Sequence, residues 1–369
     1  MHKARLPRPD EIEDLNQLTA ICFGFHPGPS RARTGGRSPR VPKGARIVVA
    51  DGKPVSHLRI AYNYLSVQGA RVKVASFGGV CTHPDYRGRG IATQLLESCV
   101  RETVKAKALL LFISGMRGLY RRAHAVPAGL VWRVSVRPGC PGTVPGAVSV
   151  RGAGAEDWRS VALLHQAERV RFVRGASFYA RVVSRGSHRG IWLVEHEGRP
   201  LAYLCLSRIW GLPRDKPVRA LAEYAGSRVA LLEGLAALLP AAGLSEVQVS
   251  FPQFDEELAY LCRRHGLGLT PDTIPGHTIR LLNLPGLMKA LRPYVLSRLS
   301  GAEARGLRFE QNEEGCRFSF GTETSEASPA QAAAIVLGGH RAPRVTGELG
   351  AILPRLFPIP VPLPGLNYV

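Results

Sequence analysis

The first third of the chain alternates between the periodicities of strands and helices. Apolar residues recur every three or four positions from Ile12 to Cys22, which predicts an amphipathic helix capped by Asp10. The elements predicted after it are strands at 46–51, 57–67, 72–82 and 108–114, and helices at 91–104 and 119–123. This order of elements is typical of a mixed α/β sheet with helices packed on it.

The middle third repeats this kind of pattern after a break. Residues 135–154 are rich in Pro and Gly, which predicts a linker between domains. The elements expected after it are helical residues at 157–173, a hairpin at 190–197 and 201–210, a helix at 228–239, a strand at 246–251 and a helix at 254–266. The middle third has no counterpart of the Arg- and Gly-rich turn at 87–92. We therefore expect it to repeat the architecture without the ligand site.

From His277 onward the pattern changes again. The expected elements are a strand at 278–284, a helix at 286–299, strands at 307–311 and 316–321, a helix at 331–339 and a Pro-rich tail. Leucines of the first helix, such as Leu287 and Leu291, share one face, which packs on its own sheet, contacts another domain or holds a lipid. The sequence thus predicts three domains, at 1–137, 138–276 and 277–369.

A large positive charge raises the question of a nucleic-acid partner. The 369 residues carry a formal charge of +21, and clustered basic residues bind nucleic acid by neutralising phosphates. Only eight of the 49 basic residues are lysine, and the arginines are spread over the whole chain instead of forming one tract. This favours a compositional bias, and we expect no nucleic-acid partner; an RNA-contacting protein, whose binding would weaken steeply with salt, stays as an alternative.

The cysteines and the apolar runs indicate whether the chain has a metal site or a membrane span and which cell compartment it occupies. Seven cysteines are scattered without a CxxC pair, which indicates reduced thiols and predicts no metal site. No stretch approaches the ~18 apolar residues that a membrane span needs, and the N-terminus turns acidic where a signal peptide would be apolar. We therefore expect a cytoplasmic protein with no membrane partner.

One segment, VCTHPDYRGRGIAT at 80–93, joins a predicted strand to a predicted helix. Backbone N–H groups at a helix N-terminus bind phosphate, and Gly88 and Gly90 would let phosphate oxygens approach the backbone. Arg87 and Arg89 would add charge-assisted hydrogen bonds to the same anion. The segment lacks the G-x-G-x-x-G of a Rossmann turn and the G-K-[ST] of a P-loop. An RNA-contacting loop and an ordinary turn stay as alternatives.

This segment resembles the acetyl-CoA motif of the GNAT acetyltransferases, R-x-x-G-x-A, placed between a strand and an amphipathic helix. The whole chain resembles the Eis (enhanced intracellular survival) family, through this motif, residues 118–122 and the segments at 278–287 and 337–342. The resemblance implies tandem GNAT folds, the second degenerate, followed by a sterol-carrier-like α+β domain. It also implies that acetyl-CoA is the co-substrate and that it is held by Val80, Cys81, Thr82, Arg87, Gly88, Arg89, Gly90, Ile91, Ala92 and Thr93.

The implied reaction is acetylation of a small-molecule or peptidyl amine. A protonated amine must lose a proton before its nitrogen attacks the thioester, and the departing thiolate benefits from a nearby acid. The resemblance places the family's general-acid tyrosine at Tyr120 and its base at the C-terminal carboxylate, which here belongs to Val369 in place of the family's aromatic terminus. Aminoglycosides are an implied substrate class, but the positive field of the chain repels a polycation unless acidic residues line the pocket, so a less charged amine is an equal alternative.

Two further expectations follow from the resemblance. By analogy with the family, the protein is expected to form a homo-oligomer. The alternative to catalysis is a lipid- or acyl-CoA-binding protein that uses the sterol-carrier-like domain and transfers no acetyl group. Bound lipid in purified protein, without transfer, would favour that alternative.

Overall fold

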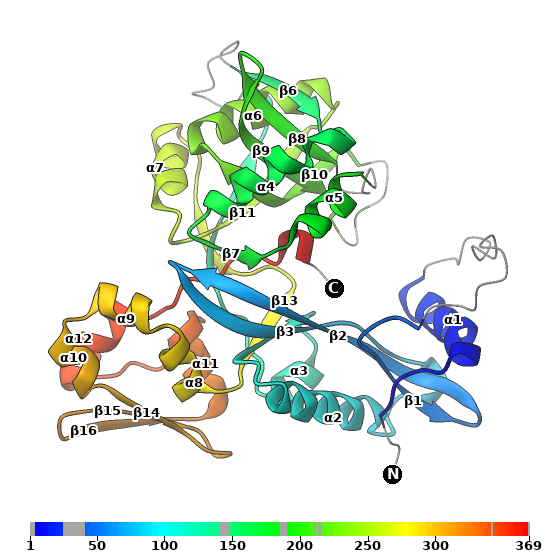
Figure 1. Cartoon of the computed structure of the whole chain (residues 1–369), viewed down its shortest axis with the longest axis vertical. Helices are drawn as coiled ribbons and strands as arrows, with labels where there is room; N and C mark the ends of the chain where they lie inside the picture. The colour runs from blue at the N-terminus through cyan, green and yellow to red at the C-terminus, as the bar shows by residue number, and fades with distance from the viewer. Residues whose placement is uncertain are drawn as a thin grey trace.

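The structure, a computed structural model, describes residues 4–24, 41–139, 148–184, 190–209, 212, 216–340 and 342–367. Val369, the expected base, and residues 140–147 of the expected linker lie outside the described residues. Three sheets organise the described part of the chain, and Figure 1 shows them in three separate regions, coloured blue to cyan, green, and orange. The expected mixed α/β fold is confirmed.

The first sheet contains the strands expected from the first third of the chain. Its order is β1 (Ala45–Ala50), β2 (Lys53–Val67), β3 (Ala70–Thr82), β4 (Leu110–Ser114) and β13 (His277–Leu281), with β7 (Val170–Val173) paired to the end of β2. The strands β1 to β3 are antiparallel, whereas β3 and β4 are parallel because α2 (Ile91–Lys105) crosses between them. The helix expected over 157–173 is wrong at its end, since 170–173 pairs as β7.

Different elements cover the two faces of this sheet. Helices α2 and α3 (Gly118–Arg122) pack on one face, against a core that contains Val48. Helix α1 (Ile12–Phe23) packs on the other face, against Ile47, the neighbour of Val48. We call these the α2 face and the α1 face. Asp10 does not cap α1 as expected, because the helix begins after Glu11, whose carboxylate accepts the N–H of Arg8 at 2.7 Å.

The second sheet repeats the topology of the first. Its order is β12 (Thr270–Thr273), β5 (Leu130–Val136), β11 (Glu246–Pro252), β10 (Val218–Gly226), β9 (Arg199–Ser207), β8 (Ile191–His196) and β6 (Ser149–Gly152). Strands β8, β9 and β10 are antiparallel, and β10 is parallel to β11 across α6 (Arg228–Ala241). Helices α4 (Trp158–Ala167) and α5 (Ala176–Ser184) cover one face, while α6 and α7 (Glu256–Arg264) cover the other.

Three strands join regions that the sequence assigned to different domains. β5 precedes the expected linker but pairs in the second sheet, β7 follows the linker but pairs in the first, and β13 joins the start of the expected third domain to β4. The expected linker is also shorter than 135–154, since β5 ends at Val136 and β6 begins at Ser149. The division at 137 and 276 stays a prediction.

The third region combines a small sheet with several helices. The antiparallel sheet contains β14 (Arg308–Gln311), β15 (Cys316–Phe320) and β16 (Glu323–Ala327). The helices are α8 (Leu284–Ala290), α9 (Arg292–Arg298), α10 (Gly301–Gly306), α11 (Pro329–Leu337) and α12 (Gly347–Leu356). The helix expected over 286–299 is broken into α8 and α9, because Pro293 fits the first turn of a helix better than its interior.

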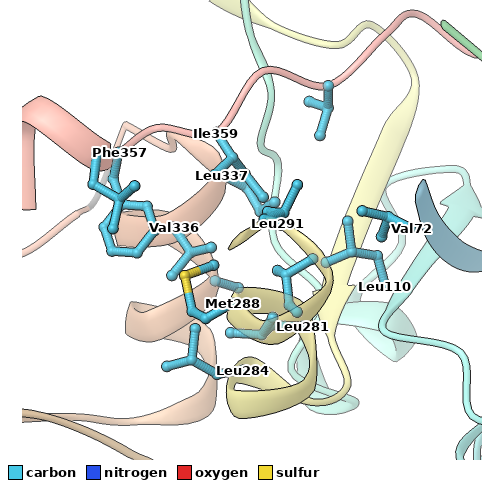
Figure 2. Packing of buried hydrophobic residues seen from close by; sticks show 14 of the residues in the cluster. Val72, Leu110, Leu281, Leu284, Met288, Leu291, Val336, Leu337, Phe357 and Ile359 are labelled. Carbon is cyan, nitrogen blue, oxygen red and sulfur yellow. The ribbon is translucent and has the colours of Figure 1, made fainter. Parts of the chain in front are cut away.

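The leucine face of α8 and α9 contacts another region of the molecule. Leu287 and Leu291 are fully buried in one cluster with Val72 of β3 and Leu110 of β4, on the α1 face of the first sheet. Figure 2 shows this cluster, in which side chains of α8, α11 and the segment after α12 meet those of β3 and β4. Phe318 of β15 belongs to the same cluster, so this face packs on the sheet of its own region as well as on the first sheet. The sterol-carrier-like fold stays a prediction.

The Pro-rich tail connects all three regions. After α12 it passes through the shared core at Ile359 and Val361, and its last described turn is η4 (Gly365–Asn367). Leu366 packs against the core under α4 and α5 of the second sheet. Figure 1 shows the tail, in red, ending between the second sheet and the β2–β3 hairpin. None of the helices in the described ranges is long and apolar enough to cross a membrane.

Candidate active site

Strands β3 and β4 separate beside the Arg- and Gly-rich turn. Their parallel pairing covers Val74 to Phe77 of β3, but β3 continues to Thr82 paired with β2 alone. The β4 side of residues 78–82 is therefore a strand edge without a strand partner in the described chain, to which an amide-bearing ligand can bind. The Arg117 guanidinium already donates to one group of this edge, the carbonyl of Val80, at 3.4 Å. Val80, Cys81 and Thr82, three of the predicted site residues, lie on this edge.

A β-bulge bends β3 where the separation begins. Gly79 and Val80 together face a single residue of β2, Leu58. The imidazole of His57 lies behind the bulge, with Nδ1 3.1 Å from the carbonyl oxygen of Gly79. Burial lowers the pKa of His57 to about 4, so the ring is neutral near pH 7 and Nδ1–H donates to that carbonyl. A neutral buried histidine thus supports the bulged edge.

The turn after β3 leaves open space above two glycines. Gly88 and Gly90 have φ angles of 77° and 73°, in the left-handed region that favours glycine. A Cβ added at either position would meet no heavy atom within 4 Å, apart from chain neighbours. A ligand can therefore approach this backbone closely.

The arginines of the turn are exposed and only partly engaged. Arg87 Nε donates to the carbonyl of Thr82 at 3.2 Å, and Arg89 Nη2 donates to that of Asp85 at 2.8 Å. The Arg89 guanidinium also stacks on Tyr86, 4.9 Å from the ring centre, and the Tyr86 hydroxyl donates to Asp51 in the β1–β2 turn. Each guanidinium keeps further N–H donors for an anion.

Helix α2 begins at this turn without a side-chain cap. Its N-cap is Gly90, and the N–H groups of Ile91, Ala92 and Thr93 belong to the first turn, which has no intrahelical acceptors. The Ile91 side chain is buried in the core, so only its backbone can contact a ligand. The helix dipole adds partial positive charge here. Nearby, Gln94 Oε1 is buried and has no hydrogen-bond partner among the described residues.

Tyr120 lies at the end of β4 on the α2 face. Its side chain is almost fully buried, in the core that α2 and α3 share with the sheet. Gly115 directly follows β4 with a φ angle of 122°, and a Cβ there would lie 2.9 Å from Tyr120 Cε2 and 3.6 Å from its hydroxyl oxygen. Glycine is thus required for the hydroxyl to reach this position beside the β3–β4 gap.

A second group of polar residues lies on the opposite, α1 face of the same gap. Ser76, Ser114, His277 and Asn367 line one small cavity together with aromatic side chains and the tail. Ser114 and His277 are direct partners in the β4–β13 pair, so their side chains point to the same face. Burial lowers the pKa of His277, whose Nδ1 lies 2.9 Å from the carbonyl oxygen of Pro275.

Sequence reasoning missed this α1-face group. Ser76, a polar residue inside an apolar strand run, was the available signal; His277 could not be placed, because its strand pairs with β4 across more than 160 residues of chain.

Comparison with known families decides the class of the first region. Residues 3–138 match the profile of the Acetyltransferase (GNAT) domain. Residues 3–138 are a GNAT acetyltransferase domain. The chain is thus an acetyltransferase enzyme, of a class that uses acetyl-CoA or another acyl-CoA as donor. No curated protein sequence matches the chain.

Solved structures extend the similarity of fold beyond the GNAT domain. The chain is similar to a GCN5-related N-acetyltransferase from Kribbella flavida, with 17% identity, 98% of each chain covered and a TM-score of 0.64. It is similar to Eis1 from Mycobacterium abscessus, with 13% identity, 100% of each chain covered and a TM-score of 0.63. A GCN5-related N-acetyltransferase from Anabaena variabilis has 15% identity and a TM-score of 0.61, with 92% of this chain and 90% of that chain covered. At these identities the likeness concerns the fold, including the tandem arrangement.

Proposed function

We propose that the chain is an N-acetyltransferase that transfers the acetyl group of acetyl-CoA directly to an amine. One observation carries the proposal. The gap between β3 and β4 opens beside an uncapped, glycine-rich helix N-terminus, with Tyr120 on its α2 face and the polar cavity on its α1 face. A thioester in the gap would be accessible from both faces.

The GNAT domain would bind acetyl-CoA through two surfaces. The pyrophosphate would accept hydrogen bonds from backbone N–H groups of residues 88–93 and from Arg87 and Arg89. The amides of the pantetheine arm would pair with the edge of Val80–Thr82 as a strand does. The open positions of Gly88 and Gly90 support this fit, because a side chain there would occupy the space that the phosphates need.

The two faces would separate the two proton transfers. A neutral amine on the α1 face attacks the thioester carbonyl, the C–N bond forms and the C–S bond breaks as the tetrahedral intermediate collapses. The thiolate leaves on the α2 face and takes a proton from the Tyr120 hydroxyl, while a base on the α1 face takes the proton that the amine loses. Acid and base on opposite faces of one gap suit this addition of the amine and elimination of the thiolate.

We propose the C-terminal carboxylate as that base. Asn367, two residues before the chain end, lines the α1-face cavity beside Ser114 and His277. Two residues span up to about 7 Å, so the carboxylate of Val369 is within reach of the cavity. The acceptor is proposed to be a small-molecule or peptidyl amine of modest charge, since the charge of +21 repels polycations such as aminoglycosides.

A panel of amines assayed by thiol release from acetyl-CoA tests the proposed function. At least one amine should give release that is saturable in both substrates and yields an acetylated product by mass spectrometry. Release without an acetylated amine, or no release with any amine although acetyl-CoA binds, would overturn the proposal. Lipid extracted stoichiometrically from the purified protein, with no transfer, would favour a binding protein built on a sterol-carrier-like third domain.

A further inference from the structure

A buried ion pair in the second sheet lies directly under the tail. Arg174, the residue after β7, donates from Nη1 and Nη2 to the two carboxylate oxygens of Glu223 on β10, at 2.7 and 2.6 Å. The side chains are 1% and 9% exposed. The Tyr203 hydroxyl also donates to Glu223, at 2.7 Å. Burial alone would raise the pKa of Glu223, but Arg174 lowers it to about 2, so the carboxylate stays ionised.

The same two side chains hold the last described turn of the tail. The N–H of Leu366 donates to Glu223 Oε2 at 2.8 Å, and Arg174 Nε donates to Asn367 Oδ1 at 2.6 Å. Asn367 Nδ2 in turn donates to Asn63 Oδ1 on β2, at 3.3 Å. The pair therefore connects the tail to the second sheet, and Asn367 connects it onward to the first.

The contact with Glu223 requires a glycine in the tail. Gly365 has a φ angle of 51°, and a Cβ there would lie 2.1 Å from Glu223 Oε2. Only glycine brings the N–H of the next residue close enough to that carboxylate. A buried, charge-assisted bond to a chain end that would otherwise fray indicates a fixed position for the tail.

The contact between Glu223 and the tail lies where the parallel pairing of β10 and β11 ends. In the second sheet, β10 is the counterpart of β3, and Glu223 lies just beyond the end of the parallel pairing with β11, after a bulge at Ala222. Glu223 accompanies Tyr203 on the face covered by α4 and α5, where Leu366 also packs. In the second sheet, the tail is thus held at the position that corresponds in topology to the gap of the first sheet.

We propose that Arg174 and Glu223 are positioning residues that anchor the tail through Leu366 and Asn367, and so keep Asn367 at the α1-face cavity beside Ser114 and His277. The role of the second sheet in the reaction is then to hold the base for the first. This inference rests on the proposed function for its catalytic half, whereas the anchoring can be measured without any activity.

Hydrogen exchange of the tail tests the anchoring directly. In Glu223→Gln, the amide of Leu366 loses its charged acceptor, and its exchange should accelerate about ten-fold or more relative to wild type. The matched control is Glu195→Gln, which breaks the pair with Arg151 in the same sheet, away from the tail, and should leave tail exchange unchanged. Equal tail protection in wild type and Glu223→Gln would overturn the proposal, whether or not the enzyme transfers acetyl groups.

Kinetics then test the positioning. Glu223→Gln should lower kcat about ten-fold with little change in the KM for acetyl-CoA, whereas adding one glycine after Val369 should lower kcat by itself. Because both changes act through the same base, the combined variant should be no slower than the slower single variant. Losses that multiply, or turnover unchanged by the added glycine, would overturn the positioning role.

A second variant guards against misfolding of Glu223→Gln, which leaves a buried arginine without its counter-ion. Asn367→Ala removes the tail's side-chain contacts and keeps the ion pair. It should give a smaller effect in the same direction, about three-fold in kcat, with the same lack of additivity to the added glycine. Full activity and full tail protection in this variant, together with an unfolded Glu223→Gln, would overturn the proposal.

Discussion

The two large sheets share a topology and differ in the connection that follows the third strand. In the GNAT domain, residues 83–90 lie between β3 and α2, and the helix N-terminus has no side-chain cap. In the second sheet, Ser227 alone lies between β10 and α6, and its hydroxyl accepts the N–H of Ala230 at 3.3 Å. The capped helix has no turn in which to hold a phosphate. The proposed acetyl-CoA site thus depends on the connection after the third strand more than on the sheet.

The difference also concerns what covers the opposite faces. The α1 face of the first gap has a polar cavity, whereas the corresponding face of the second sheet holds the tail through Glu223. In the proposed mechanism, the first sheet holds the reaction site and the second sheet positions the tail for it.

The largest effect is expected from the tyrosines under the two sheets. Tyr120→Phe removes the proposed acid and should lower kcat by about 10² to 10⁴, the usual contribution of general acid catalysis. The control, Tyr179→Phe, removes an equally buried hydroxyl, which bonds to His165 in the second region, and should keep kcat near wild type. Equal kcat in wild type and Tyr120→Phe would contradict the assigned role.

A pH effect of intermediate size is expected from the histidine behind the first bulge. The pKa of His57 is about 4 in the folded chain against a usual value of 6.5, so the unfolded chain binds the proton first, and stability falls as pH drops from 6.5 to 4. At pH 4.5 the low pKa of His57 reduces the free energy of unfolding by about 2 to 3 kcal/mol.

Urea unfolding at pH 7.5 and 4.5 measures this, with His57→Gln losing less stability on acidification than wild type. His165 in the second region, whose pKa burial lowers to about 3, supplies the part of the pH slope that persists in the variant. Identical pH slopes for wild type and His57→Gln would show that His57 is not buried neutral.

A smaller effect separates two glycines that precede the two crossover helices. Gly90→Ala places a methyl group in open space at a positive φ, so it should weaken acetyl-CoA binding about ten-fold while costing only about 1 kcal/mol of stability. Gly226→Ala should do the reverse, because its Cβ would lie 2.2 Å from the carbonyl oxygen of Leu201. Gly52→Ala, also open and at positive φ, controls for backbone strain. Calorimetric affinity that responds equally to Gly90→Ala and Gly52→Ala would remove the turn from the site.

The smallest effect concerns the fourth residue of each helix, which is Gln94 in α2 and Leu231 in α6. Gln94→Leu removes a buried oxygen that has no hydrogen-bond partner in the described part of the chain, so the free protein should be as stable as wild type or up to about 1 kcal/mol more stable. If that oxygen accepts a hydrogen bond from acetyl-CoA, the variant should bind acetyl-CoA a few-fold more weakly. Thermal unfolding with and without acetyl-CoA measures both, and an unchanged ligand-induced shift would exclude Gln94 from the site.

Local features of the chain could be predicted, and long-range pairing could not. The glycine turn, the helix after it and Tyr120 lie within a short stretch, where spacing and residue type carry the information. The placement of β5, β7 and β13 in sheets of other regions depends on partners far away along the chain. The α1-face cavity brings Ser76 together with His277 and Asn367, and no local pattern signals that meeting.

Calorimetric titration with acetyl-CoA measures whether the GNAT domain alone binds the acetyl donor. We expect one acetyl-CoA per chain, and no measurable binding by a folded variant that combines Arg87→Ala with Gly90→Ala. Two acetyl-CoA molecules per chain, or unchanged affinity in that variant, would contradict this expectation.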